Sequence, residues 1–369
     1  MSEPSNPPRP KRLLALDVMR GVAVFLMMEQ HIGVWLWQSY ASPSTFRDYP
    51  LFVGFNALGG GAAPLFISLA GAGISLFVAS RAGRWTSSQV DTTLIRRGLG
   101  VMAFGYLLNF LTPSWFNPGS WFVLHLMGAA ILAGPIWRRL PTWALLTLAA
   151  GILFAAAGLQ EWMDTPSHLS NTRMRDTGQP GGAFRLAFVE GQFPIFPWLA
   201  LFLEGVVLGR WIAASRWSAV HRLAGGSLAL GVVLALVFAL GGPSVRQGAL
   251  YHFVRFDGIF YPCSPAYILL VGGLVMSVTA AVMAWERRRP LAADGVMVSL
   301  GRASLTLLLL HVWMFRELSR SVGLWSSLSA PQAFGGTLLA IGIFTLLAWQ
   351  WRKINFRYGA EWVLRKVAG

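Results

Sequence analysis

The chain has 369 residues, of which 55% are hydrophobic and 12% are charged. A soluble globular domain carries about 25% charged residues, so this composition excludes an ordinary soluble enzyme and a disordered chain and indicates a polytopic membrane protein. The net charge of +15 does not indicate a nucleic-acid partner, because excess Arg is typical of cytoplasmic loops. One cysteine excludes a disulfide framework.

The apolar segments predict an all-α fold, a polytopic membrane bundle of about ten transmembrane helices. We expect a tail over residues 1–12, a membrane domain over 13–352 and a second tail over 353–369. A further apolar stretch, 51–55, is expected as a re-entrant or interfacial piece. The candidate spans are 13–37, 60–80, 94–111, 121–137, 143–159, 194–212, 223–240, 266–285, 296–315 and 334–351.

The distribution of Lys and Arg predicts that both termini are cytoplasmic. With that orientation twenty of the thirty basic residues fall inside and eight outside, while Arg20 and Arg302 lie in or beside spans. A cleaved signal peptide is the rival interpretation of the first segment. Its apolar run is too long for one and carries Glu29 and His31, which suit a helix inside a bundle. Eight tryptophans near the predicted interfaces, Trp35 and Trp115 among them, are expected to form an aromatic belt.

Ionisable side chains in the first span are the leading functional candidates, since charge inside a membrane is costly. Arg20 and His31 are eleven residues apart, which puts them on one helix face about 16 Å apart along the axis. Asp17 lies one turn before Arg20 and can pair with it. Glu29 points elsewhere. A purely structural reading stays open, in which the Asp17–Arg20 pair locks helix packing and His31 is a satisfied core histidine.

Other polar residues also fall within the predicted bilayer. His125 and His311 lie in the same outer half as His31, so the topology allows the three to meet at one cavity. Their spacing gives no support for a metal site, and we expect none. Glu204 lies mid-span and needs an Arg or His partner. Arg302 and Arg20 form an inner cluster suited to phosphates, with positive-inside anchoring as the alternative.

Four motifs together resemble the transmembrane acyltransferases, and most closely the bacterial relatives of heparan-alpha-glucosaminide N-acetyltransferase. They span about residues 13 to 315, and their order makes the set more specific than any one. The motifs are Leu16-Asp17-Val18-Met19-Arg20-Gly21 running on to His31, Ala63-Pro64-Leu65-Phe66 with Leu69-Ala70-Gly71, Phe196-Pro197-Trp198-Leu199 with Glu204-Gly205 and Leu208-Gly209-Arg210, and Gly301-Arg302-Ala303-Ser304-Leu305 running on to His311.

This resemblance implies an integral protein of a bacterial inner membrane that moves an acetyl or other acyl group from cytoplasmic acyl-CoA to a carbohydrate or glycolipid of the cell envelope. The acceptor group would be a sugar hydroxyl or amine on the outer side. In the O-acetylating branch, an Arg and a His of the first helix are motif residues, and they map to Arg20 and His31. The lysosomal member has Asn at the position of His31, and its proposed catalytic His follows in the next lumenal segment. This chain has no His between His31 and His125.

The hypothesis for mechanism assigns CoA phosphates to Arg20 and Arg302, with Asp17 orienting Arg20. His31 acts as general base on the acceptor, or forms an acetyl-imidazole as the covalent alternative. The supporting candidates are His125, Glu204, His311 and Glu29. A proton-coupled transporter or flippase of an envelope sugar or lipid is the main rival, and a non-catalytic partner in envelope assembly is a third reading. The oligomeric state stays open.

Overall fold

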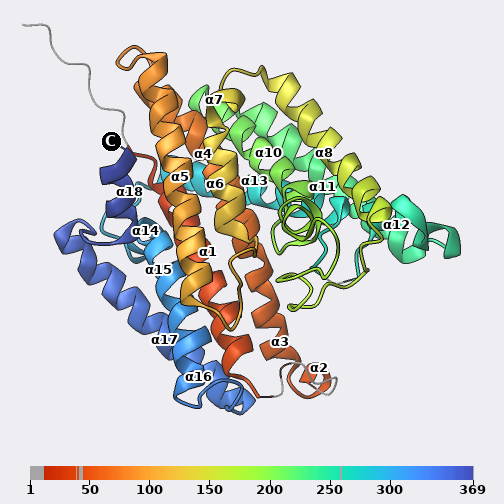
Figure 1. Cartoon of the computed structure of the whole chain (residues 1–369). Helices are drawn as coiled ribbons and strands as arrows, with labels where there is room; N and C mark the ends of the chain where they lie inside the picture. Colours follow the sequence, from red (N-terminus) through yellow and green to blue (C-terminus); the bar gives the residue numbers. More distant parts are fainter. Residues whose placement is uncertain (1–11, 39, 41–44, 258–259, 369) are drawn as a thin grey trace, which may run out of the picture.

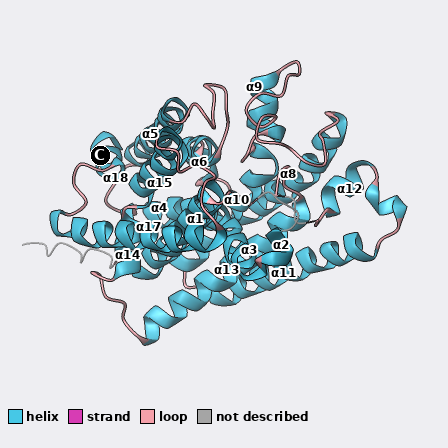
Figure 2. Cartoon of the chain, turned by 90° about the horizontal axis from the view of Figure 1, so that it is seen from below, coloured by secondary structure: helices cyan, strands magenta, loops and turns pink. Residues whose placement is uncertain are grey.

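The computed structural model describes residues 12–38, 40, 45–257 and 260–368. Within these ranges the chain forms helices joined by loops, with an isolated bridge between Trp37 and Leu328 (Figures 1 and 2). The predicted all-α fold is therefore confirmed for the described residues. The predicted N-terminal tail, 1–12, lies outside them except for Arg12.

The helices follow one another in a single series from the first span to the C-terminal end. Short 3₁₀ turns cover Leu58–Gly61 (η1), Pro243–Arg246 (η3) and Arg352–Ile354 (η5), and π-helical turns cover Leu186–Glu190 (η2) and Trp313–Leu318 (η4). The α-helices are α1 (Leu14–Leu36), α2 (Thr45–Asp48), α3 (Pro50–Ala57), α4 (Ala62–Arg81), α5 (Ser87–Leu111), α6 (Val123–Leu132), α7 (Gly134–Trp137), α8 (Thr142–Trp162), α9 (Gly182–Arg185), α10 (Ile195–Ala213), α11 (Trp217–Leu240), α12 (Gly248–Val254), α13 (Pro265–Arg288), α14 (Val296–Arg302), α15 (Ser304–Val312), α16 (Ser319–Ser321), α17 (Ala330–Trp351) and α18 (Ala360–Ala368).

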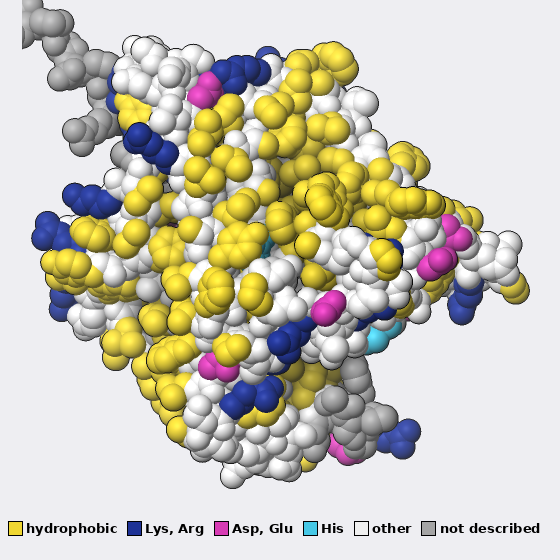
Figure 3. All heavy atoms as spheres, viewed as in Figure 1, with side chains coloured by type: hydrophobic (Ala, Val, Ile, Leu, Met, Phe, Trp, Pro, Cys, Tyr) yellow, Lys and Arg dark blue, Asp and Glu magenta, His cyan; other side chains and the backbone are white. Residues whose placement is uncertain are grey.

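Among the described residues, seven helices are long and apolar enough to cross a membrane, and an eighth if the bent pair α14–α15 counts as one span. Figure 3 shows hydrophobic side chains over much of the central band of one face, as a lipid-facing surface requires. The protein is therefore a helical membrane protein. The seven spans are Pro50–Arg81, Ser87–Leu111, Thr142–Trp162, Ile195–Ala213, Trp217–Leu240, Pro265–Arg288 and Ala330–Ile354.

Three of the ten expected spans differ from this pattern, so the count of ten stays a prediction. The first, α1, has 23 residues, about 34 Å, but its polar residues lower its hydropathy. The fourth corresponds to α6, whose ten residues reach about 15 Å, half of a hydrocarbon core. The ninth is broken between α14 and α15 by a bend of 75°.

The stretch 51–55 is not a re-entrant piece, because it continues directly into the second span. Helix α3, the 3₁₀ turn and α4 form one continuous segment, Pro50–Arg81. The turn allows α1 to come close: a Cβ on Gly59 would overlap the Cβ of Gln30. Gly59 therefore permits the close packing of η1 against α1.

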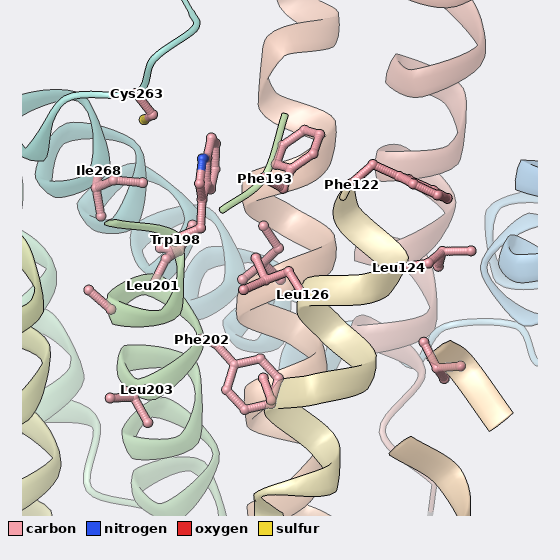
Figure 4. Close-up of a cluster of buried hydrophobic side chains, with 14 of the residues drawn as sticks. Phe122, Leu124, Leu126, Phe193, Trp198, Leu201, Phe202, Leu203, Cys263 and Ile268 are labelled. Carbon is pink, nitrogen blue, oxygen red and sulfur yellow. The ribbon is translucent and has the colours of Figure 1, made fainter. Parts of the chain in front are cut away.

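Helix α1 lies at the centre of the bundle, which explains how it carries so much polarity. Figures 1 and 2 show it surrounded by neighbouring helices, and it packs against α4, α13, α14, α15 and α17. Polar groups that lipid would penalise are thus enclosed by protein. Beside α1, an apolar core joins α4, α6 and α10; Figure 4 shows Phe193, from the loop before α10, next to Trp198 of α10.

Glycines set the distance between the helices that define the core. A Cβ on Gly21 of α1 would overlap the carbonyl oxygen of Met297, and one on Gly301 of α14 would overlap that of Asp17. On α10, Gly205 and Gly209 meet α4 in the same way, in the small-x-x-x-small spacing typical of membrane helix pairs. Each crossing brings two backbones into direct contact and fixes their relative height.

The segment after residue 352 packs back onto the bundle. The carboxylate of Glu361 on α18 accepts hydrogen bonds from the backbone N–H groups of Leu305 and Thr306, at 2.6 and 3.1 Å. It therefore caps the exposed start of α15. Helix α18 and the start of α1 lie at the same end of the bundle (Figure 1).

We expect Gly205→Leu to destabilise the protein, since its side chain would enter the backbone of α4 at Ser68. Overpacking of this kind costs about 1–3 kcal/mol. The matched control is Gly226→Leu on α11, where a Cβ meets nothing within 4 Å. Thermal unfolding of both variants in detergent tests this, and equal melting temperatures would contradict the packing account.

Candidate active site

The N-terminal end of α1 holds a buried carboxylate between two guanidinium groups. Asp17 accepts from Arg12 at 2.5 and 2.9 Å and from Arg20 at 3.3 Å, while its own side chain is 2% exposed. The predicted Asp17–Arg20 pair is thus confirmed, and Arg12 is a partner that the sequence did not indicate. The hydrogen bond to Asp17 raises the pKa of Arg12. The pair of cations leaves this end of α1 with a net positive charge.

A large inner cavity of about 1310 Å³ opens beside this cluster. Arg12, Asp17 and Arg20 line it from α1, and Arg84 and Glu286 line it from other segments. Both carboxylates are occupied, since Glu286 accepts the backbone N–H groups of residues 14 and 15 at 3.0 Å. Four arginines, Arg12, Arg20, Arg84 and Arg287, line the cavity against these two carboxylates, so its net formal charge is positive, which suits phosphate groups.

Further arginines surround this cavity at different places. Arg81 and Arg97 both lie on the ring of Phe77, which lines the cavity, with Cζ atoms 5.5 and 4.5 Å from its centroid. Arg302, expected beside Arg20, is not among the lining residues and packs on the ring of Phe356 at 4.8 Å. The described residues thus place Arg20, but not Arg302, at the cavity wall.

The outer part of α1 carries a histidine pair. His31 Nδ1 lies 2.9 Å from His311 Nε2, and His311 Nδ1 lies 2.7 Å from the carbonyl oxygen of Leu307. A carbonyl only accepts, so His311 Nδ1 carries the proton. In the neutral ring Nε2 then accepts, and His31 Nδ1 must donate to it. This chain of bonds leaves the lone pair of His31 on Nε2, as a general base requires.

Aromatic rings hold this pair in position. Trp35 stacks on His31 with ring centroids 4.7 Å apart, and Trp115 meets His31 edge-on at 5.6 Å. Trp35 is 4% exposed and packs inside the protein, so the expectation that it belongs to an aromatic belt is wrong, whereas Trp115 is partly exposed. Arg316 lies over both rings, at 5.7 and 5.2 Å, and over Trp325 at 4.3 Å.

A second, smaller cavity of about 140 Å³ lies at this outer site, with His31 in its wall. Two connecting loops complete it: Gln192 and Phe193 follow η2, and Phe260 and Tyr261 precede α13. The other residues of its lining come from α1, η1, α4, α5, α6, α15 and the loop between α5 and α6. Segments far apart in the sequence therefore build one enclosed site around His31.

A buried ion pair fixes the first of these loops. Arg185 donates to Glu190 at 2.6 and 3.1 Å, and Thr165 donates to the same carboxylate at 3.2 Å. The hydrogen bond to Glu190 raises the pKa of Arg185. Two residues further on, Gln192 donates its backbone N–H to Trp121. The loop is thereby tied to both sides of the outer cavity.

One face of α4 connects the two cavities. Ala63, Phe66, Ala70, Gly73 and Phe77 follow each other at intervals of three and four residues, so they share that face. All five are partly exposed, while the residues between Phe66 and Gly73 on the other faces are buried. The first two line the outer cavity and the last two the inner one. Ala70 lies between them, within a gap of about 10 Å.

Three expected supporting residues lie away from His31. His125 packs against Tyr106 and Trp121, with centroids 4.5 and 5.5 Å away, so only His31 and His311 of the three histidines meet. Glu29 faces away as expected and is bonded to Asn56 at 3.1 Å.

Glu204 is buried, and its Oε2 atom has no hydrogen-bond partner among the described residues. The Arg or His partner expected from the sequence is therefore not found at this atom. Among the residues that the structure describes, no group of three His, Cys, Asp or Glu side chains lies close enough to hold a metal ion.

The comparison with family profiles accounts for this architecture. The profile of the heparan-alpha-glucosaminide N-acetyltransferase catalytic domain matches residues 12–242. The chain belongs to this family. No curated protein gives a match. The family resemblance drawn from the sequence is confirmed, and it supports a membrane acetyltransferase over a transporter.

The family profile covers Arg20, His31 and most of the inner cavity wall. It stops before α13, which adds Met283, Glu286 and Arg287 to that wall. His311 and Arg316 lie beyond the matched region. Sequence reasoning missed Arg316, Gln192 and Tyr261 because they follow helices or lie in loops, where no periodicity marks a face. The mixture of four carboxylates and three arginines in the loop 160–193 was the available sign that the loop is structured.

Proposed function

We propose that the protein transfers an acetyl group from acetyl-CoA, or another acyl group from its CoA thioester, to a carbohydrate or glycolipid acceptor on the opposite side of the membrane. The observation that carries this proposal is the pair of cavities at the two ends of the α1 stripe, one cationic at Arg20 and one aromatic at His31. The proposed setting is a bacterial inner membrane, crossed ten times, with both termini and the inner cavity on the cytoplasmic side.

The inner cavity suits the nucleotide end of CoA. Its volume of about 1310 Å³ exceeds the roughly 300–1,000 Å³ of ordinary ligand pockets. Arg12, Arg20, Arg84 and Arg287 line it, and guanidinium groups bind phosphates in a bidentate manner. Arg302 is off this wall, so the proposal assigns phosphate contacts to Arg20 and its neighbours in the cavity.

The pantetheine arm would extend along the partly exposed face of α4. Ala70 and Gly73 place little or no side-chain volume on this face, and the two cavities lie at its opposite ends. The gap of about 10 Å between the two cavities along α4 is shorter than the separation of about 16 Å between Arg20 and His31 along α1. The thioester would thereby reach the outer cavity while the phosphates stay at Arg20.

His31 then serves as the general base. Its Nε2 atom takes the proton of the acceptor group as that group attacks the thioester carbonyl carbon, and the proton passes on to the departing thiolate. His311 is a positioning residue, because its acceptor nitrogen fixes the tautomer of His31. Asp17 is assigned a similar role toward Arg20.

We expect His31→Gln to lower the rate of acetyl transfer by about 10²- to 10⁴-fold, the usual contribution of a general base. His311→Leu should lower it as well, while His311→Gln should restore part of the rate, because a Gln oxygen can accept from His31 Nδ1. His168→Gln, at an exposed position in the outer loop, is the control. Transfer of labelled acetyl from acetyl-CoA in proteoliposomes measures each rate. Equal rates for His311→Leu and His311→Gln would show that no tautomer is being fixed.

Arg20→Ala should weaken use of acetyl-CoA but not of N,S-diacetylcysteamine, a truncated donor with the same thioester and no phosphates. A loss of about tenfold or more in kcat/KM with the full donor matches the loss of one charge-assisted phosphate contact. Arg96→Ala, at an exposed position of α5, is the matched control. An equal loss with both donors would mean that Arg20 acts only through the fold.

A further inference from the structure

The outer cavity offers hydrogen-bonding groups without formal charge. Its polar lining side chains are Gln30, His31, Gln192, Tyr261 and the indole of Trp115, and none of its described lining residues is Asp, Glu, Lys or Arg. The remaining wall is apolar and aromatic. A ligand that fits here must therefore satisfy amide and hydroxyl groups rather than neutralise a charge.

The carboxylates nearest in sequence to this lining are engaged elsewhere. Glu29 adjoins Gln30 but is bonded to Asn56, at a separate small pocket of α1 and α3. Glu190 precedes Gln192 by two residues, and its two oxygens are held by Arg185 and Thr165. Neither carboxylate lines the outer cavity, where it could pair with a cationic ligand.

A positive charge lies behind one part of the cavity wall. The guanidinium of Arg316 lies 5.2 Å from the ring centroid of Trp115, whose ring is in the lining. Glu317 lies on the same turn, and its Oε1 atom accepts the backbone N–H of Ser114 at 2.9 Å. An ammonium group in the cavity would lose its hydration and find no counter-ion there.

The free amides match vicinal hydroxyl groups. Among the described residues nothing is hydrogen-bonded to the side-chain amides of Gln30 and Gln192, and each can both donate and accept, as a sugar hydroxyl does. The rings of Phe116, Phe122 and Phe193 supply flat apolar walls for the C–H faces of a pyranose.

Building on the acyltransferase function above, we propose that the acceptor group is an uncharged hydroxyl of a neutral sugar or polyol and that the product is an ester. The hydroxyl loses its proton to Nε2 of His31 as its oxygen bonds to the acyl carbon. The carbon–sulfur bond of the thioester breaks, and the thiolate takes the proton from His31. A sugar amine, which enters as an ammonium group at neutral pH, is not the acceptor.

The chemistry of the transferred label tests this without knowledge of the acceptor. Membranes containing wild type or His31→Ala are incubated with acetyl-labelled acetyl-CoA, protein and unreacted acetyl-CoA are removed, and the remaining product is treated with alkaline hydroxylamine, which cleaves esters and spares amides. We expect nearly all of the His31-dependent label to be released. A hydroxylamine-stable product would overturn the ester proposal but keep the acyltransferase, whereas no label that depends on His31 would overturn the proposed function itself.

Gln192→Glu ties the product to the outer cavity. A carboxylate there should lower ester formation by about tenfold, the effect of burying an unmatched charged hydrogen-bonding group. Gln179→Glu, exposed in the same loop, is the control, and Gln30→Glu is a second variant in the cavity. Thermal unfolding identifies any variant that does not fold. Wild-type ester yield in both folded cavity variants would overturn the assignment of this cavity to the acceptor.

Discussion

The close crossing of α1 and α14 is the constraint on which the outer site depends. Gly21 and Gly301 bring the two backbones into contact, and the chain then bends by 75° into α15. This geometry sets the height at which His311 faces His31, and a hydrogen bond of 2.9 Å leaves little tolerance for a change in that height. A larger residue at either glycine would therefore alter the histidine pair before it altered the outline of the bundle.

Because α1 lies at the centre of the bundle, neighbouring helices shield its polar side chains from lipid. Lipid would penalise Asp17, Arg20 and His31, but each has a protein partner: Asp17 has two guanidinium groups, and His31 has an imidazole and two indoles. The seven clear spans provide the lipid-facing wall, and α1 carries the functional groups inside it. This division between outer and inner helices explains why α1, which carries the strongest functional candidates, is not among the seven clear spans.

Local periodicity predicted the parts of the site that belong to one helix. The 3.6-residue period gave the shared stripe of Arg20 and His31, and the one-turn spacing gave the Asp17–Arg20 pair. It could not give the contact between His31 and His311, because that contact depends on a bend at Ala303 and on the glycine crossing, neither of which has a periodic signature.

Composition alone also misassigned residues whose surroundings decide their role. Trp35 was expected at a membrane interface, yet it is buried against His31, because a tryptophan near a helix end has the same sequence context in both cases. The apolar stretch 51–55 was expected as a re-entrant or interfacial piece, yet the helix continues from it through the glycine-rich turn into α4, since packing against α1 stabilises a backbone that glycine alone would not. Loop residues such as Gln192 became visible only through the tertiary fold.

The central claim is that one thioester cofactor reaches from Arg20 to His31. A cryo-EM structure with acetonyl-CoA, a thioether analogue that cannot release its acyl group, measures this directly. The account predicts density for the phosphates beside Arg20 and a carbonyl carbon close enough to His31 Nε2 for an acceptor oxygen to lie between them, within about 3–3.5 Å of each reacting atom. An analogue whose phosphates lie at the outer cavity, or whose carbonyl ends in the inner cavity with the α4 face still empty, would contradict it.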